Sequence, residues 1–456
     1  MSLSSTQERD ASAGTAPVDV HAERRRRFMR QIGDQAAALV FANPVRTRSN
    51  DTTYAYRPSS DLWYLTGCEE PDAVCLLLPG HDEHPFVLFV RPRDFSREVW
   101  DGPRLGLEGA HEVLGADKAF AVSELDDVLP KLLMGRSMIV HHLGRDEDAD
   151  KHVVSAYAKA QGMARGRATA PTSIVDIAPL LHEQRLIKAP EEIDRLREAC
   201  RISAEGHRVA MARTRPGLTE YQLQAEIEFA FRKAGASGPS YETIVGGGAN
   251  ACVLHYIANQ GTLADGDLVL VDAGAEYGWY AGDITRTWPV NGRFEGRQRT
   301  IYDLVLRAEQ AVIRKVKPGV PWTDLHQTAV EVISTGLVDL GILEGPAERV
   351  IEDKTFRKFF MHGTGHWLGM DVHDVGMYVT AGGSPRVLEP GMVFTVEPGI
   401  YFHPQEEATP EKWRGIGVRI EDDVVVTRQG HKVLTEAAPK TVAEIEAAMA
   451  QARQAA

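Results

Sequence analysis

Hydrophobic and polar positions divide the chain into two regions with different patterns. Over roughly the first 175 residues, short apolar runs with strand character alternate with amphipathic stretches. The apolar runs are AALVFA, AVCLLLPG, PFVLFVR and SMIVHH, and the clearest amphipathic stretches are HAERRRRFMRQIG and VSELDDVLPKLL. Strands that alternate with helices are typical of a sheet covered by helices. We therefore predict an α/β domain in this region.

The second region begins with a strongly helical segment, LHEQRLIKAPEEIDRLREACRISAEGHRVAM. Pro190 followed by Glu191 and Glu192 is a typical helix start, so we expect the boundary between the regions at about 175–190. Further along the pattern predicts a helix at TEYQLQAEIEFAFRKAG, then hairpins, two helices around 297–340, a strand-rich stretch over 355–428 and a last helix at KTVAEIEAAMAQAR. Helices grouped apart from hairpins indicate an α+β domain.

Composition and net charge limit the classes of partner that the protein can be expected to bind. The chain has 456 residues, 43% hydrophobic and 25% charged, which is enough for two soluble domains with their own cores. A net charge of −13 repels nucleic acid and anionic membranes, so neither is expected as a main partner. The basic run Arg24–Arg27 is an exception, and we interpret it as the solvated face of a helix.

The N-terminal residues and the cysteines indicate the cellular compartment in which the protein is expected. Residues 1–19 are rich in Ser, Ala, Thr and Asp, and we predict a disordered tail that lacks the apolar segment of a secretory signal. The sequence contains no run of about 18 apolar residues, so no membrane span is predicted. Four cysteines without a pairing pattern are typical of free thiols in a reducing compartment. We therefore expect a cytoplasmic protein.

The acidic stretch GRDEDADK, at 144–151, has acidic residues at alternate positions, as calcium loops do. Lys151 stands where such a loop needs glycine. We therefore predict a solvated surface loop without a metal.

Three histidines lie in the segment KFFMHGTGHWLGMDVHD. His362 and His366 have the spacing of two side chains on one helix face, but Gly363, Gly365 and Gly369 make a helix unfavourable here. The segment is therefore expected to be irregular, and any chemistry of its histidines needs partners from elsewhere in the chain.

Carboxylates that could be those partners lie in DLVLVDAGAEYGWYAGDITRTWPV. A tight turn at Tyr277-Gly278 would pair Asp272 with Asp283 across a hairpin. Two carboxylates so placed repel by roughly 3 kcal/mol at an effective dielectric constant near 20. A divalent cation between them reverses the sign of that energy. The alternative is a slipped register that leaves both side chains exposed.

Two further apolar runs carry carboxylates. Glu397 ends the run in EPGMVFTVEPGIYF, and Arg419 and Glu421 lie two residues apart in WRGIGVRIEDDVVVT, so that both leave the same face of a strand. An arginine beside a buried carboxylate can orient it and keep it ionised.

Four carboxylates with at least one histidine suit manganese, cobalt or iron better than a thiolate zinc site. The set exceeds the needs of a single zinc ion and fits two cations about 3.5–4 Å apart that share a water. His-Glu-x-x-His, the usual one-zinc protease signature, is absent, since HEVLG and HEQRL both lack the second histidine.

Five segments in this order resemble aminopeptidase P: YETIVGGGANACVLHY, VDAGAEYGWYAGDITRTWPV, FFMHGTGHWLGMDVHDVG, GMVFTVEPGIYF and RGIGVRIEDDVVVT. Aminopeptidase P is the Xaa-Pro aminopeptidase branch of the pita-bread metallopeptidases, which include prolidase and methionine aminopeptidase. The resemblance implies a creatinase-like N-terminal domain over 20–180 and a pita-bread catalytic domain over 185–445.

The resemblance also implies roles for individual residues. Two metal ions, usually manganese, would be bound by Asp272, Asp283, His366, Glu397 and Glu421, with Asp283 and Glu421 bridging both ions. His255, His362 and His373 would line the substrate site, supported by Arg419 and Tyr401, while Trp100 resembles a tryptophan that the N-terminal domain presents to a substrate pocket. The alternative for each histidine is a buried structural side chain. A homodimer or homotetramer is implied as well.

The activity implied is hydrolysis of the bond between an N-terminal residue and a following proline, so the partners are peptides with proline in the second position. Prolidase, which acts on Xaa-Pro dipeptides, is the nearest alternative. A pita-bread protein that has lost catalysis and serves as a binding module is another, but all five expected metal ligands are present. A creatinase-type hydrolase would not be expected to keep the full set of carboxylates.

Overall fold

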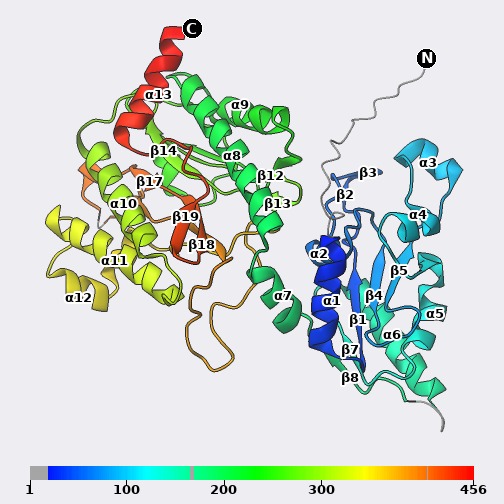
Figure 1. Ribbon diagram of the computed structural model, residues 1–456. Helices are drawn as coiled ribbons and strands as arrows, with labels where there is room; N and C mark the ends of the chain where they lie inside the picture. Colours follow the sequence, from blue (N-terminus) through cyan, green and yellow to red (C-terminus); the bar gives the residue numbers. More distant parts are fainter. Residues whose placement is uncertain (1–18, 165–168, 408, 456) are drawn as a thin grey trace, which may run out of the picture. The chain divides into compact units, whose positions relative to one another are not determined.

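The computed structural model describes residues 19–164, 169–407 and 409–455 (Figure 1). Contacts divide the chain into two compact units, of which unit 1 ends at Leu181 and unit 2 begins at His182. Apart from Asp19, the predicted tail lies outside the described residues. No helix of the described segments is long and apolar enough to cross a membrane.

Unit 1 contains a six-stranded sheet in the order β6-β5-β4-β1-β7-β8. β1 pairs antiparallel with β4 and parallel with β7, so the sheet is mixed. The four predicted apolar runs form four of these strands. The strands are β1 (Ala36–Phe41), β4 (Val74–Leu77), β5 (Phe86–Val90), β6 (Lys118–Ala121), β7 (Met138–Val140) and β8 (Ser173–Val175), with a separate hairpin of β2 (Thr47–Ser49) and β3 (Thr52–Thr53).

The helices of unit 1 pack around this sheet and confirm the predicted α/β class. Leu125 and Leu129 of α5 and Val153 of α6 share one buried cluster with strand residues such as Leu39 and Val87. The helices are α1 (Val20–Ile32), α2 (Ser60–Thr66), α3 (Phe95–Asp101), α4 (Gly106–Glu112), α5 (Leu125–Leu132) and α6 (Glu147–Met163); α7 (Ala178–Leu186) follows at the boundary of the units.

Two expectations for unit 1 are corrected. The acidic stretch predicted as a loop is half helical: Asp146 caps α6 by accepting hydrogen bonds from the amides of Asp148 and Ala149, which is why acidic residues gather there. The basic run of α1 is only half solvated. Arg24 and Arg25 are buried and donate hydrogen bonds to the carbonyl oxygens of Tyr64 and Leu65.

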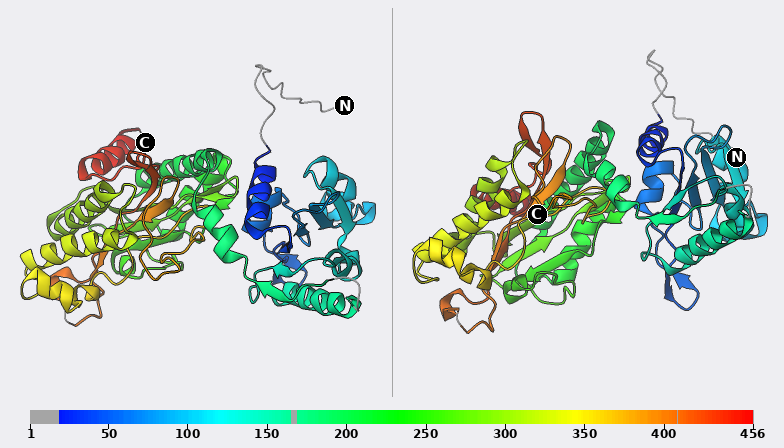
Figure 2. Two further views of the ribbon diagram at one scale, coloured as in Figure 1. Left: turned by 60° about the horizontal axis from the view of Figure 1, so that its bottom comes forward. Right: turned by 90° about the horizontal axis from the view of Figure 1, so that it is seen from below.

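Unit 2 is the α+β region that the sequence predicted. Its helices are α8 (Pro190–Arg213), α9 (Glu220–Lys233), α10 (Gly296–Lys315), α11 (Trp322–Asp339), α12 (Ala347–Glu352) and α13 (Val442–Ala455). Its strands are β9 (Gly238–Pro239), β10 (Ile244–Gly247), β11 (Leu268–Asp272), β12 (Ala275–Tyr277), β13 (Tyr280–Ala281), β14 (Thr285–Pro289), β15 (Val393–Val396), β16 (Gly399–Tyr401), β17 (Gly417–Arg419), β18 (Asp422–Thr427) and β19 (Gly430–Val433). α8 contacts β12 and β13 on one side of the strands, while α10 contacts β15, β16 and β17 on another (Figures 1 and 2).

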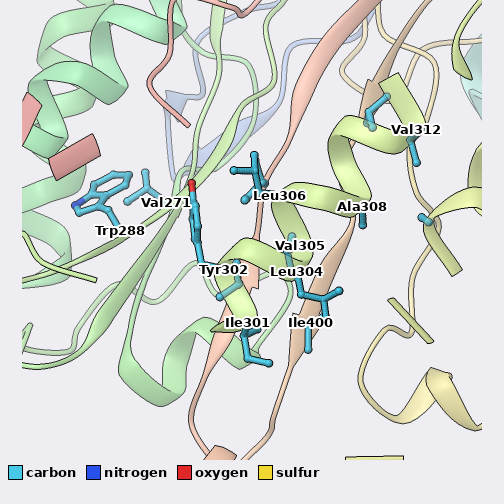
Figure 3. Close-up of a cluster of buried hydrophobic side chains, with 14 of the residues drawn as sticks. Val271, Trp288, Ile301, Tyr302, Leu304, Val305, Leu306, Ala308, Val312 and Ile400 are labelled. Atoms are coloured by element: carbon cyan, nitrogen blue, oxygen red, sulfur yellow. The ribbon is translucent and has the colours of Figure 1, made fainter. Parts of the chain in front are cut away.

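The hydrophobic core of unit 2 joins its helices to its strands. Val271 of β11 and Trp288 of β14 belong to one buried cluster with Tyr302 and Leu306 of α10 and with Ile400 of β16 (Figure 3). Burial of such large side chains stabilises the fold by roughly 1.5–3 kcal/mol each. The core therefore packs against β11, which ends at the predicted metal ligand Asp272, and against β14 and β16.

The hairpin that carries Asp272 and Asp283 corrects the predicted register. The turn residues are Gly278 and Trp279, both with positive φ, and Tyr277 pairs with Tyr280. The turn thus lies one residue later than predicted. Asp272 is paired with Thr285 rather than with Asp283. A shift of two positions along the partner strand keeps every side chain on its face, so the two carboxylates still project to the same side.

Candidate metal centre

Two aspartates meet at the hydroxyl group of one tyrosine. Asp272 ends β11, Asp283 lies between β13 and β14, and both are largely buried. The hydroxyl oxygen of Tyr241 lies 2.6 Å from Oδ1 of Asp272 and 2.5 Å from Oδ1 of Asp283. One hydroxyl hydrogen serves two carboxylates, which leaves their other oxygens for further partners.

Glu421 reaches the same place from the short segment between β17 and β18. The apolar strand predicted around it is interrupted, since β17 ends at Arg419 and β18 begins at Asp422. Arg419 and Glu421 nevertheless both contact the hydroxyl of Thr285: Nε of Arg419 donates to it at 3.0 Å, and it donates to Glu421 at 2.6 Å. The arginine forms its ion pair with Asp272, at 2.6 Å, and so joins β17 to the hairpin.

His366 and Glu397 complete the group from segments 360–375 and 396–399. The glycine-rich segment forms no helix over 360–375, as predicted. Nδ1 of His366 donates a hydrogen bond to the carbonyl oxygen of Trp367 at 3.0 Å, so Nε2 is the ring nitrogen that is left to bind a cation. That nitrogen lies 3.4 Å from Oδ2 of Asp283 and 3.7 Å from Oε1 of Glu397.

Burial and mutual repulsion raise the pKa values of Asp283, Glu397 and Glu421. Burial raises the pKa of Glu397 to about 7, and it raises the pKa of Asp283 and, well above its usual range, that of Glu421. Burial lowers the pKa of His366, but the neighbouring Asp283 outweighs it and raises the pKa to about 9. Without a cation, the fully ionised site would hold an excess of buried negative charge.

The donor set fits divalent cations. One ligand atom each from Asp283, His366 and Glu421 lie within 4.8 Å of one another. Donors to a single ion with metal–ligand distances of about 2.1 Å lie up to roughly 4.2 Å apart, so a small movement brings all three onto one cation. Carboxylate oxygens with one imidazole nitrogen are the ligands that manganese and similar ions prefer.

All five predicted ligands and the three remaining predicted histidines line one cavity of about 460 Å³ within unit 2. Charged, imidazole and apolar side chains all contribute to its lining. The lining residues include Asp272, Asp283, His366, Glu397, Glu421, His255, His362, His373, Arg419, Ile244, Leu254, Ile257 and Val372. A cavity of this size accommodates a short peptide segment.

His362 is held by a side-chain hydrogen bond. Its Nδ1 donates to the carbonyl oxygen of Gly363 at 2.7 Å, so Nε2 accepts the hydroxyl hydrogen of Tyr401 at 2.9 Å. The tyrosine oxygen in turn accepts a hydrogen bond from Arg419 at 3.0 Å. Burial, together with the arginine charge, lowers the pKa of His362 to about 3, so this imidazole is neutral.

His373 and His255 are more exposed. The ring of His373 stands edge-on to that of His366, with centroids 4.3 Å apart, and burial lowers its pKa. His255 follows the 3₁₀ turn η2 (Gly248–Cys252). Both imidazoles lie on irregular backbone at the cavity, where a bound substrate would reach them.

The segment with His373 is anchored by buried ion pairs. Asp374 lies 2.7 Å from Nη2 of Arg185 and 2.8 Å from Nζ of Lys188, and all three side chains are almost completely buried. Arg185 also contacts Asp371 at 2.9 Å. Arg185 and Lys188, near the start of unit 2, thus anchor the segment that carries His373.

Trp100, predicted to face a substrate pocket, lies in unit 1 on α3, where no residue is buried. The side chain is 85% exposed. Its contact with substrate stays a prediction.

Three further side chains at the site were not predicted from the sequence. Tyr241 bridges the aspartates, and Thr285 joins Arg419 to Glu421. Asp423, fully buried, accepts the backbone N–H of Asp283 at 3.0 Å and the thiol of Cys200 at 3.1 Å. Only Asp423 left a signal, as one of three consecutive acidic residues at the start of an apolar strand.

Family comparisons cover both units. The family model described as Metallopeptidase family M24 matches residues 194–428, and the one described as Aminopeptidase P, N-terminal domain, matches residues 21–141. The Xaa-Pro aminopeptidase of Escherichia coli K12 is 49% identical over 94% of this chain and 97% of its own length.

Solved structures give the same picture. Pseudomonas aeruginosa aminopeptidase PepP superimposes with a TM-score of 0.94 at 49% identity, covering 96% of this chain and 99% of its own. Zinc-substituted Escherichia coli aminopeptidase P in complex with product superimposes with a TM-score of 0.92 at 48% identity, covering 95% of this chain and 98% of its own. The resemblance found in the sequence is thus confirmed, as are the creatinase-like and pita-bread folds it implied.

Proposed function

This chain belongs to metallopeptidase family M24, and we propose that it is an Xaa-Pro aminopeptidase that uses two manganese ions. The enzyme hydrolyses the peptide bond between an N-terminal residue and a following proline. One observation carries this proposal: five side chains of metal-ligating type, from separate segments, line a single cavity together with three further histidines.

The residues that would hold the ions are Asp272, Asp283, His366, Glu397 and Glu421. Their oxygen-rich donor set, with a single imidazole, supports manganese over zinc. Asp283 and Glu421 would bridge the two ions, His366 and Glu397 would hold one of them, and Asp272 the other. Two cations in this site would supply a hydroxide from a shared water near neutral pH.

The remaining chemistry falls to side chains of the chain itself. Glu397 would accept the proton of the attacking water and carry it to the proline nitrogen, which leaves well only when protonated. An imidazole of His255 or His373 would donate a hydrogen bond to the scissile carbonyl oxygen, where negative charge develops. His362, neutral and fixed by Tyr401, would orient the substrate rather than move a proton.

The negative charge of the site explains why the enzyme would remove only one residue from the N-terminus of its substrate. The free α-amine of a substrate is cationic, and the carboxylates that line the cavity attract it. A peptide extended further at its N-terminus has no such charge at this position. The same geometry serves a prolidase, so substrate length is the property to test.

An assay of metal-loaded enzyme on Xaa-Pro dipeptides, Xaa-Pro-Xaa tripeptides and matched Xaa-Ala-Xaa tripeptides tests the proposal. We expect cleavage of the Xaa-Pro-Xaa peptides, little cleavage of the alanine peptides, loss of activity on chelation and its return with manganese. Cleavage of dipeptides alone would identify a prolidase. Activity that survives thorough chelation would refute the metal mechanism.

Assembly and compartment complete the proposal. We propose a homodimer or homotetramer, which light scattering on a sizing column measures directly. A cytoplasmic location is supported by the four cysteines, all of which are buried as free thiols.

A further inference from the structure

We propose that Glu220 is a positioning residue for the substrate-binding histidine His255, acting through the hydroxyl group of Tyr256. The inference rests on the proposed function, because that function makes His255 one of the two candidate donors to the scissile carbonyl oxygen, and the inference assigns that role to His255. Glu220 itself lies outside the cavity lining and binds neither substrate nor metal in this scheme.

Glu220 is a fully buried carboxylate that receives four hydrogen bonds. It is the first residue of α9, with no exposed surface. Its Oε1 accepts the backbone N–H of Gly247 at 2.7 Å and the side-chain amide of Asn250 at 2.9 Å. Its Oε2 accepts the hydroxyl of Tyr256 at 2.9 Å and the backbone N–H of Gly261 at 2.6 Å. All four donors are neutral, and all belong to the segment 247–261.

These four bonds close the segment 247–261 into a loop. The carboxylate binds the backbone amide at each end, so Gly247 and Gly261 are held on one side chain. The fit at Gly261 is close: a Cβ atom there would approach Cδ of Glu220 to 2.9 Å. Beyond η2 the backbone over 253–261 belongs to no helix or strand. Its conformation therefore depends on side-chain anchors rather than on a ladder of backbone hydrogen bonds.

The anchored residues stand next to those that line the cavity. Leu254, His255 and Ile257 line it, whereas Tyr256 points to α9 and its buried carboxylate. The hydroxyl of Tyr256 donates to Glu220 and accepts from the side-chain amide of Asn250 at 3.0 Å and from the backbone N–H of Gln260 at 3.4 Å, so its position is defined by three partners. Because Tyr256 and His255 are consecutive, fixing the tyrosine ring limits where the imidazole can lie.

A second anchor shows that α9 supports the loop along its length. Asn259, 1% exposed, accepts the N–H of Val245 at 2.9 Å and donates to the carbonyl oxygen of Thr243 and to Gln224, both at 2.8 Å. Glu220 and Gln224 lie one turn apart on the same face of α9. A single helix face thus holds both sides of the loop on which His255 stands.

Tyr256→Phe tests the proposal, because it removes one hydroxyl group and keeps the ring. We expect kcat on an Xaa-Pro-Xaa peptide to fall about tenfold while KM stays within about twofold, since a bond to a buried carboxylate is lost. Tyr221→Phe on the exposed face of the same helix is the matched control and should equal the parent enzyme.

A double-mutant cycle separates positioning from general weakening. In a His255→Ala background, Tyr256→Phe should change kcat less than about twofold, because the group it positions is already gone. A further tenfold loss in that background would overturn the proposal. Glu220→Gln, which turns an amide toward donors, should lower kcat at least as much as Tyr256→Phe.

Hydrogen exchange supplies a readout that does not depend on activity. In the free protein, Tyr256→Phe should speed exchange of amides within 253–260 at least about fivefold while the amides of β11 and β14 keep their protection. Unchanged exchange in the loop would overturn the proposal. If the parent enzyme cleaves no Xaa-Pro peptide, the proposed function fails, and the exchange result still decides whether the carboxylate positions the loop.

Discussion

The candidate site has two sides that are built in different ways. The carboxylates Asp272, Asp283 and Glu421 lie at or beside strand ends and are largely buried. The histidines His255 and His373 lie on irregular segments and are exposed at the cavity. Groups that must share cations need fixed separations, whereas groups that meet a substrate must remain accessible. The molecule therefore uses backbone pairing on one side and side-chain anchors on the other.

On the strand side, positions follow from the pairing of β11 with β14. That register determines that Asp272 stands opposite Thr285, whose hydroxyl binds Glu421. Arg286, fully buried, strengthens the arrangement from behind by donating to the carbonyl oxygens of Thr285 and Glu421. The side chains on these strands can change position only if the backbone pairing of β11 with β14 also changes.

On the loop side, each histidine has its own polar anchor. Tyr401 holds His362, Tyr256 is bound by Glu220, and Asp374 beside His373 is bound by Arg185 and Lys188. Loss of one anchor should therefore disturb one histidine, whereas loss of a strand ligand should disturb the whole site.

The largest effect is expected from Asp283→Asn. The amide keeps the shape of the side chain but removes the charge that bridging two cations requires, and metal catalysis supplies several kcal/mol. We expect the rate to fall by more than about a thousandfold and the bound metal to decrease, measured by peptide assay and by metal analysis. An unchanged melting temperature of the metal-free protein serves as the control for folding; a normal rate would contradict the strand side as the metal site.

Asp374→Asn should give the next largest effect, on stability. It leaves the charges of Arg185 and Lys188 buried without their shared partner, which typically costs about 3 kcal/mol in free energy of unfolding. Urea denaturation measures this. The exposed Asp339→Asn is the control, expected within about 0.5 kcal/mol of the parent. Equal stability of the two variants would show that this segment needs no anchor.

His207 tests the support beneath the strands. It is fully buried on α8 and donates from Nε2 to the carbonyl oxygen of Ala273 at 3.0 Å, and burial lowers its pKa to about 4. In the unfolded chain the imidazole binds a proton below about pH 6.5, whereas in the folded protein it stays neutral until about pH 4. The free energy of unfolding therefore decreases as the pH falls from about 6.5 toward 4.

Comparison with His207→Gln, which cannot titrate, isolates that contribution. Between pH 7 and pH 5 the parent should lose about 2 kcal/mol of unfolding free energy more than the variant does. Denaturation curves at the two pH values measure the difference. Parallel losses in the two proteins would show that His207 takes up its proton while folded.

The smallest effect is expected from Tyr401→Phe. The ring stays in the core, but His362 loses its donor and Arg419 one acceptor. One hydrogen bond of this kind is worth about 1.4 kcal/mol, so kcat/KM should fall about tenfold while metal content is unchanged. Loss of metal in this variant would show that the two sides of the site are coupled more closely than their separate anchors indicate.

The sequence predicted those parts of the site that are marked by an unusual residue in an apolar setting. Asp272, Asp283, Glu397 and Glu421 lie in or next to apolar runs of the sequence, and the glycines around His366 make a helix unfavourable. The supporting residues lacked such a mark. Glu220 has the ordinary sequence context of an acidic residue in a first helical turn, and Tyr241 that of any tyrosine before a strand. Their roles depend on partners 20 or more residues away in the chain.

The hairpin that carries Asp272 and Asp283 shows which features the local sequence could not predict. The alternation of side chains correctly placed both aspartates on one face, but the turn was predicted one residue early, because Trp279 adopts a positive φ that its residue type disfavours. Patterning along the chain thus determined the fold class, the elements and the inventory of reactive side chains. Which of them meet was decided by tertiary structure, because the energy of a buried charge depends on neighbours that arrive from other sheets and loops.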